Sequence, residues 1–208
     1  MKRVTYRKFL RLDPYDFTGS KQRAFMRSFF RRKGRCTALD ILGLAEIPDC
    51  AKVYLVLHEA LLEKNTLQEF TCLCAGRALG HIEHPDPRSA AAIQAKRAWL
   101  RGEMPDGELA AAHAAALAAV RDSEGIGKIA AWSCVWASET HCPGGNARDA
   151  ANDAAWVAAE ESARAAATGI PGMAPWSAAW TCAWEMGFYA ERRWQVEALK
   201  GLLQEAQP

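Results

Sequence analysis

Histidine and cysteine are the side chains of this chain best suited to chemistry, and their spacing limits the kind of site they can form. The seven cysteines are odd in number, and none belongs to a CxxC pair. A zinc site needs ligands at closing distances, and its only candidates are His81 with His84 and His141 with Cys142. We therefore expect reduced, buried thiols that pack as small hydrophobes, with no metal and no cofactor.

Catalytic signatures are also missing from the sequence. It contains no P-loop, no GxSxG, no HExxH and no Rossmann glycine fingerprint. His58 with Glu59, and His81 with Glu83, stand without a nucleophile at a telling spacing. His113 lies in a run of alanines, which is typical of a helix histidine whose hydrogen bonds are satisfied. We predict no catalytic residues and a protein that is not an enzyme.

Charge is unevenly distributed along the 208 residues, although the net charge is only +2. Residues 1–35 hold twelve Lys/Arg and two Asp, whereas residues 36–208 hold fourteen Lys/Arg and twenty-two Asp/Glu. The two segments therefore carry net charges of +10 and −8. Such an asymmetry often marks an interaction surface. We expect two domains: a basic N-terminal segment with an amphipathic helix (1–35), and an alanine- and tryptophan-rich helical bundle (36–208).

Alanine content predicts the fold class. Residues 90–208 contain thirty-four alanines against seven in residues 1–89, and alanine is the best helix former. Asp86 and Pro87 mark one helix start, Gly102 marks the end of that helix, and Thr66 with Glu69 is spaced as a capping box. We predict an all-α protein, a compact bundle of about seven to nine helices with short loops.

Tryptophans at helical spacing could form a core seam, a ligand cage or a partner surface. Trp176, Trp180 and Trp184 stand at i, i+4 and i+8. The helix expected over 146–168 has a nearly bare alanine stripe, which favours large side chains packing into small ones. We expect five tryptophans to lie mostly in the core: Trp99, Trp132, Trp136, Trp180 and Trp184.

Two charged surfaces are the candidate binding sites for a partner. The first is an acidic stripe on the helix face opposite the alanine stripe, formed by Asp149, Asp153, Trp156 and Glu160. This stripe is either an ordinary solvated helix face or a surface that binds a basic partner. The second is the arginine face of the N-terminal helix: Arg23, Arg27, Arg31 and Arg32. The arginine face suits phosphates, so nucleic acid is an alternative partner. The amphipathic pattern of the helix is explained equally well if its phenylalanine face docks onto the acidic remainder of the chain.

The expected location is cytoplasmic, without membrane contact. No apolar run reaches the roughly 18 residues that a membrane span needs. The N-terminal residues also lack the unbroken apolar stretch of a signal peptide.

Residues 72–119 resemble the Imm-5-like family of bacterial immunity proteins. The similarity lies in a "D-x-R-x-A-I-x-A-x-R-x-W-x-x-G-E" helix that is followed by an alanine-rich helix, and in a terminal "E-x-x-W-Q" helix with Trp194 and Gln195. The matching residues of the first helix are Asp86, Arg88, Ala92, Ile93, Ala95, Arg97, Trp99, Gly102 and Glu103. The resemblance covers about residues 70–205 and leaves the basic segment 1–35 outside.

The resemblance implies an all-α protein that binds and neutralises a toxin stoichiometrically, with no catalytic residues. Relatives also occur in phage genomes, which admits a phage-encoded inhibitor of a bacterial defence system, such as an anti-CRISPR. Both alternatives are non-enzymatic inhibitors that bind a protein partner, and contact with nucleic acid through the basic segment is a third.

Overall fold

The computed structural model describes residues 1–11, 20–138, 147–168 and 178–206. Contacts divide the chain into two units: unit 1 is residues 1–67 with 192–208, and unit 2 is residues 68–191. Two helices are shared between them in sequence. Helix α5 (Lys64–Gly80) begins in unit 1 and continues in unit 2, and α10 (Ala178–Glu205) begins in unit 2 and ends in unit 1.

Unit 1 contains the basic N-terminal segment. Strand β1 (Val4–Thr5) pairs antiparallel with β2 (Arg35–Cys36), and between them lie α1 (Tyr6–Phe9) and α2 (Ser20–Lys33), followed by α3 (Ala38–Leu42) and α4 (Asp49–Val56). The Lys2 ammonium pairs with Glu63 at 3.1 Å, and Lys33 pairs with Asp40. Residues 1–35 therefore pack against residues 36–67 in this unit.

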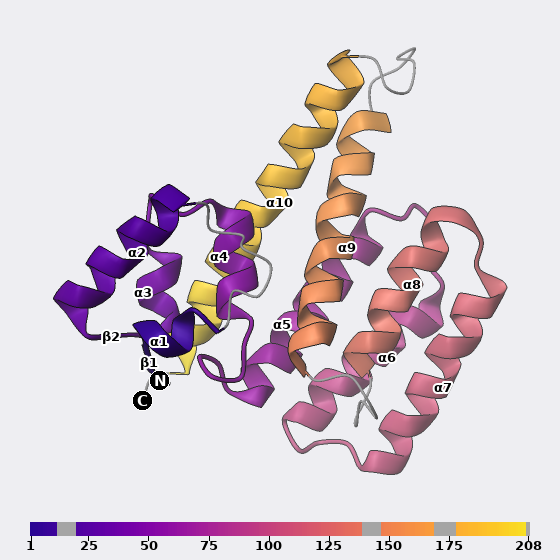
Figure 1. Ribbon diagram of the computed structural model, residues 1–208. Helices are drawn as coiled ribbons and strands as arrows, with labels where there is room; N and C mark the ends of the chain where they lie inside the picture. The colour runs from indigo at the N-terminus through magenta and orange to yellow at the C-terminus, as the bar shows by residue number, and fades with distance from the viewer. Residues whose placement is uncertain (12–19, 139–146, 169–177, 207–208) are drawn as a thin grey trace. The chain divides into compact units, whose positions relative to one another are not determined.

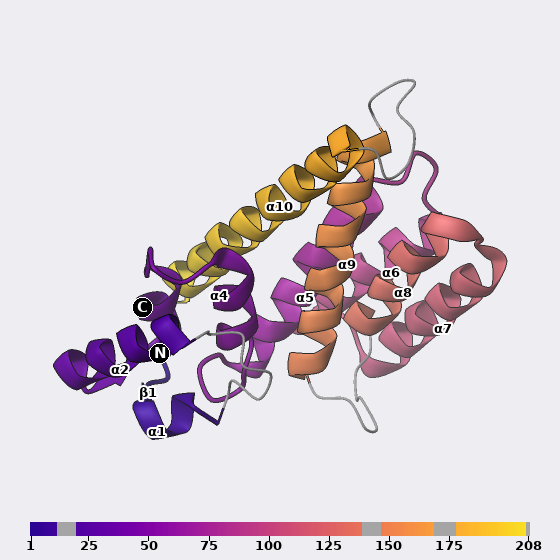
Figure 2. The ribbon, with the colours of Figure 1, turned by 45° about the horizontal axis from the view of Figure 1, so that its top comes forward.

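Unit 2 is built around four consecutive helices and the parts of α5 and α10 that belong to it. Helices α6 (Pro87–Leu100), α7 (Asp106–Asp122), α8 (Gly125–Ser138) and α9 (Ala147–Thr168) follow one another along the chain. Each packs against the next, and α6 also contacts α8 (Figures 1 and 2). The all-α prediction is confirmed, because the only strands in the described residues are β1 and β2, of two residues each. None of the described helices is long and apolar enough to cross a membrane.

Helix boundaries follow local capping chemistry. The Asp86 carboxylate accepts a hydrogen bond from the Arg88 backbone N–H at 2.9 Å, and Pro87 occupies the first helical position. At the other end Gly102 has φ +75°, and the N–H groups of Gly102 and Glu103 donate to the carbonyls of Trp99 and Ala98. The capping box expected at Thr66 is wrong, because α5 already begins at Lys64.

Among the side chains that the structure describes, alanine and valine form a core cluster in unit 2. A core cluster there consists of Ala92, Ala116, Val120, Ala131 and Val135. Four residues of the predicted stripe on α9 are fully buried: Ala151, Ala154, Ala155 and Ala158. Helices that meet through such small side chains approach closely.

The core prediction is wrong for Trp132, whose side chain is 39% exposed because it lies on the outer side of α8, whereas Ala131 and Val135 of the same helix are buried. Trp132 stacks with Trp136, with ring centroids 6.3 Å apart, and Trp99 and Trp136 are half-buried. The side chains of Trp180 and Trp184, and all of Trp176, lie outside the described part of the chain.

Candidate partner-binding surfaces

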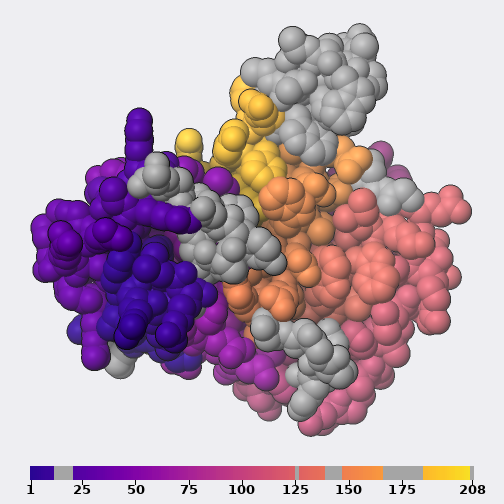
Figure 3. All heavy atoms as spheres, viewed as in Figure 1, coloured from indigo at the N-terminus to yellow at the C-terminus, as the bar shows by residue number. Residues whose placement is uncertain are grey.

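An acidic and aromatic groove lies on unit 2, where α9 meets the first part of α10. Trp156 and Glu160 line it from α9, and Glu185, Phe188 and Tyr189 line it from α10, around a volume of about 300 Å³. We call these five residues the acidic-aromatic groove. Trp156 is 51% exposed and Tyr189 is 57% exposed, so large aromatic surface faces solvent. Helices α8 and α9 both reach the surface on the face seen in Figure 3.

The rings of the groove are held in a fixed arrangement. Trp156 and Phe188 meet edge to face at 5.5 Å and 70°, and Phe188 and Tyr189 meet at 5.8 Å and 87°. Edge-to-face geometry is the favoured arrangement of aromatic pairs. The Ser162 hydroxyl donates to the Gly187 carbonyl at 3.3 Å and joins the same two helices. The aromatic surface is thus fixed before any partner arrives.

Carboxylates make the groove and its surroundings electronegative. Glu160 and Glu185 belong to the groove, and Asp149 and Asp153 lie further along α9 and are exposed. Although the Asp153 side chain is exposed, partial desolvation by neighbouring atoms, and secondly the Asp149 carboxylate, raise its pKa. Unit 2 as a whole holds nine Lys/Arg and fifteen Asp/Glu, a net charge of −6. A cationic partner would relieve this repulsion.

Such a groove can hold a basic side chain of another protein. Aromatic faces attract ammonium and guanidinium groups, and carboxylates pair with them. Exposed tryptophan and tyrosine are also the residue types that dominate binding energy at protein interfaces.

A basic surface lies on unit 1, along α2. Arg23, Arg27, Arg31 and Arg32 are all exposed, and Arg32 donates to the Ser28 hydroxyl at 2.9 Å. A groove of about 380 Å³ runs beside them, lined by Tyr6, Leu10, Arg23, Ala24 and Arg27. A second groove of about 300 Å³ adjoins it and is lined by Tyr6, Arg27, Phe30 and Arg31.

The eight predicted site residues thus divide between the units. The four arginines belong to unit 1, and Asp149, Asp153, Trp156 and Glu160 belong to unit 2. Sequence reasoning missed the α10 half of the acidic-aromatic groove. Its signal was present, because Glu185, Phe188 and Tyr189 stand at i, i+3 and i+4 and therefore share one helix face. It also missed Tyr6, which precedes the basic helix.

The cysteines of the described residues are free thiols, as expected. Cys36, Cys72, Cys74 and Cys134 are buried, whereas Cys50 is half-buried. Burial raises the pKa of Cys36 to about 11 and the pKa values of Cys72 and Cys134 to about 12. These three thiols are therefore protonated at neutral pH and poor nucleophiles. Cys142 and Cys182 lie outside the described part of the chain.

Two of the described histidines have hydrogen-bonded surroundings. His113 Nδ1 lies 3.1 Å from the Ser138 hydroxyl, which confirms a hydrogen-bonded helix histidine. His58 Nδ1 accepts from the Ala60 backbone N–H at 3.0 Å. Among the described residues, no three His, Cys, Asp or Glu side chains are grouped so as to hold a metal ion. The pair His141 and Cys142 lies outside them.

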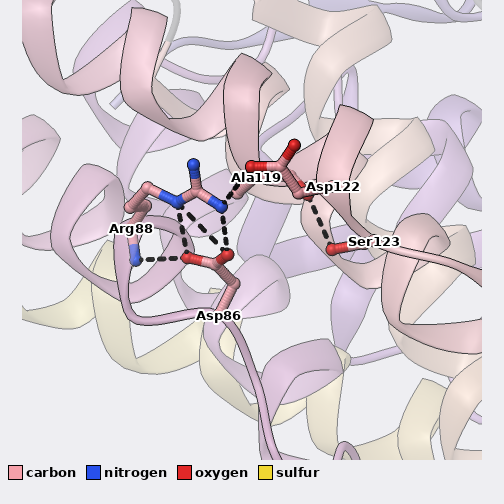
Figure 4. Close-up of polar contacts among 5 residues, drawn as sticks. All are labelled: Asp86, Arg88, Ala119, Asp122 and Ser123. Atoms are coloured by element: carbon pink, nitrogen blue, oxygen red, sulfur yellow. Dashed lines mark hydrogen bonds and ion pairs between the residues drawn. The ribbon is translucent and has the colours of Figure 1, made fainter.

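Residues that carry the family resemblance have structural partners in unit 2. Figure 4 shows the Arg88 guanidinium between two carboxylates, 2.6 Å from Asp86 and 2.8 Å from Asp122, so that it joins the start of α6 to the end of α7. The Trp99 indole N–H donates to Asp106 at 2.7 Å across the α6–α7 connection. These side chains fix the helices relative to one another, which is a structural role.

Two further residues of the resemblance also take part in ion pairs. Arg97 pairs with Glu69 of α5 at 2.9 Å. Glu103 pairs with Arg101 at 2.7 Å just after α6 ends. Comparison of the chain with protein-family models, curated proteins and solved structures gives no significant match. The resemblance to the Imm-5-like family therefore stays a prediction.

Proposed function

We propose that this chain is a non-enzymatic inhibitor of the immunity-protein type, which binds a basic toxin stoichiometrically through the acidic-aromatic groove. The observation that carries the proposal is the exposed pair Trp156 and Tyr189, which share one groove with Glu160 and Glu185. A solvent-exposed surface that displays two large aromatic rings beside carboxylates suits a protein interface.

The charge of unit 2 supports a basic partner rather than an acidic one. Its net charge of −6 attracts a cationic protein over a distance of about a Debye length, which speeds encounter. Once bound, a lysine or arginine of the partner gains cation–π contacts with Trp156 or Tyr189 and ion pairs with the two glutamates.

Co-expression tests this function directly. The proposal predicts a toxin gene beside the gene of this chain; the chain is expressed together with that toxin, and growth of the host is measured. Wild-type protein should restore growth, and a Tyr189→Ala/Glu185→Lys variant should not. The matched control is Glu83→Lys, which makes the same charge change in unit 2 at a side chain that is 91% exposed in the loop before α6. Rescue by the groove variant at the wild-type level would refute the proposal.

A further inference from the structure

A concentration of positive charge on unit 1 has no role in the function proposed for unit 2. Unit 1 holds seventeen Lys/Arg and nine Asp/Glu, a net charge of +8, and most of this charge lies in residues 1–35. Arg27 and Arg31 are exposed, and within the described residues no carboxylate pairs with either of them. Arg27 and Arg31 therefore present guanidinium groups to solvent that no carboxylate of the described residues neutralises.

The spacing of the arginines suits a phosphate backbone. Arg23, Arg27 and Arg31 follow one another at i, i+4 and i+8, on one stripe of α2. Each step of four residues advances about 6 Å along a helix axis. A row of guanidinium groups at this spacing can follow the phosphates along the backbone of one extended strand. Guanidinium groups are well suited to bind phosphate oxygens in a fork geometry.

An aromatic side chain lies beside the arginine stripe. Tyr6 lines both grooves of unit 1, together with Arg27. Its ring packs 5.6 Å from Phe30, which is buried, and Phe30 packs 5.3 Å from Phe9. A ring backed in this way is a stacking platform, and the apolar side chain of Leu10 extends it.

Packing also holds α2 in place relative to Tyr6. Met26 of α2 is fully buried, and Cys36, directly after the helix, pairs with Val4 in the two-stranded sheet. The helix and the aromatic platform therefore belong to one rigid element, so the distance from arginines to platform is set before binding.

We infer that the basic surface of unit 1 binds single-stranded nucleic acid, with phosphates on Arg23, Arg27 and Arg31 and an unstacked base against Tyr6. Single strands are favoured over duplex because only an unpaired base offers its face to an aromatic ring. The site is separate from the acidic-aromatic groove, so either proposal stands if the other fails.

Fluorescence anisotropy with the full chain tests this inference. The probes are a labelled fifteen-nucleotide oligo-dT, its RNA counterpart oligo-U, and a blunt duplex of the same length, each at salt concentrations from 50 to 200 mM. Three phosphate contacts predict a slope of log K against log salt of about −2 on the single strands, hence an affinity loss of about 20-fold across that range. Duplex should bind at least fivefold more weakly than single strand.

Three substitutions separate the phosphate contacts from the stacking contact. Arg27→Ala should weaken binding about fivefold and reduce the slope by about 0.7, whereas Arg27→Lys should keep the slope. Tyr6→Leu should weaken binding at least fivefold without changing the slope, because stacking releases no counterions. Circular dichroism confirms the fold of each variant.

The matched control is Arg193→Ala, which removes an exposed arginine of unit 1 on α10 and should leave affinity within twofold of wild type. The inference is overturned by an anisotropy that does not change at 50 mM salt. It is equally overturned if Arg193→Ala weakens binding as much as Arg27→Ala, or if duplex binds as well as single strand and Tyr6→Leu has no effect.

Discussion

Trp156 and Phe188 hold their rings edge to face at 5.5 Å, one on α9 and the other on α10. This contact builds the floor of the acidic-aromatic groove from two helices that are separated in sequence. Phe188 is half-buried, while Tyr189 beside it is exposed. The Phe188 ring therefore packs within the fold, and the Tyr189 ring is available to contact a partner.

The first prediction separates these two roles of the aromatic rings. Phe188→Ala should lower the free energy of unfolding by about 2 kcal/mol, because it removes a ring packed against two others. Tyr189→Ala should change it by less than about 0.5 kcal/mol, since an exposed side chain contributes little to stability. Urea denaturation measures both. Equal losses in the two variants would show that Tyr189 is a packing residue and weaken its assignment to binding.

The second prediction concerns the glycine that ends α6. Gly102 has φ +75°, where a side chain costs about 1–2 kcal/mol, so Gly102→Ala should destabilise the fold by about that amount. Gly76→Ala is the matched control, because Gly76 lies exposed within α5 and a methyl group there meets nothing within 4 Å. That control should stabilise by about 0.5–1 kcal/mol. A stabilising Gly102→Ala would contradict the left-handed cap.

The third prediction concerns the Asp86 carboxylate, which caps α6 and pairs with Arg88. Asp86→Ala should cost about 1–2 kcal/mol, whereas Asp122→Ala, which removes only an exposed partner of Arg88, should cost at most about 0.5 kcal/mol. Thermal unfolding at neutral pH compares the two variants. A loss for Asp122→Ala as large as for Asp86→Ala would contradict the dominant role of the cap.

The Asp86 carboxylate should also make the free energy of unfolding depend on pH. Its hydrogen bonds with Arg88 hold the pKa of Asp86 below its ordinary value. A lowered folded-state pKa gives stability that is present above the unfolded pKa of about 3.9 and is lost as pH falls through the folded pKa. The difference in unfolding free energy between wild type and Asp86→Ala should therefore shrink below about pH 4. A difference that stays constant down to pH 2 would show that the carboxylate charge does not matter.

The fourth prediction concerns a buried acid of α9, Glu161, whose pKa shift is opposite in direction to that of Asp86. Glu161 is 1% exposed, its Oε1 has no hydrogen-bond partner among the described residues, and the Arg164 guanidinium is 3.7 Å from its other oxygen. Burial raises the pKa of Glu161; Arg164 opposes this shift, and Glu160 adds to it. A raised folded-state pKa gives stability that is full below the unfolded pKa and is lost as pH rises through the folded pKa.

Glu161→Gln should therefore stabilise the protein by about 1 kcal/mol at pH 7 and by little at pH 4. Glu160→Gln, at the half-buried neighbour, is the control and should change stability by less than about 0.5 kcal/mol at both pH values. Chemical denaturation at the two pH values gives the comparison. A destabilised Glu161→Gln at pH 7 would mean that the Glu161 charge is favourable where it lies.

Local signals in the sequence predicted the helices well and the packing less well. Asp86, Pro87 and Gly102 mark helix ends through chemistry that acts within a few residues, and the structure confirms them. The position of Trp132 depends on how closely α8 and α9 approach, which is a property of two helices together. The alanine stripe is visible in the sequence, but which side chains of a neighbouring helix pack against it depends on the tertiary fold.

For the candidate site, too, the sequence shows which residues share a helix face but not which helices meet. Trp156 and Glu160 could be identified because they share a face of one helix with Asp149 and Asp153. Their neighbours Phe188 and Tyr189 come from α10, and only the tertiary contact brings them into one groove. On unit 1 the arginines were identified from charge alone, whereas the role of Tyr6 needed the fold of α1 against α2.

Binding of the partner by purified chain tests the central claim most directly. Isothermal titration calorimetry is performed with the toxin that the proposal predicts to be encoded beside this gene, using wild type, Tyr189→Ala/Glu185→Lys and the control Glu83→Lys. We predict one-to-one binding by wild type and control, and a loss of about 100-fold or more in the groove variant, as expected for interface residues that each contribute about 2 kcal/mol. Wild-type affinity in the groove variant would contradict the account.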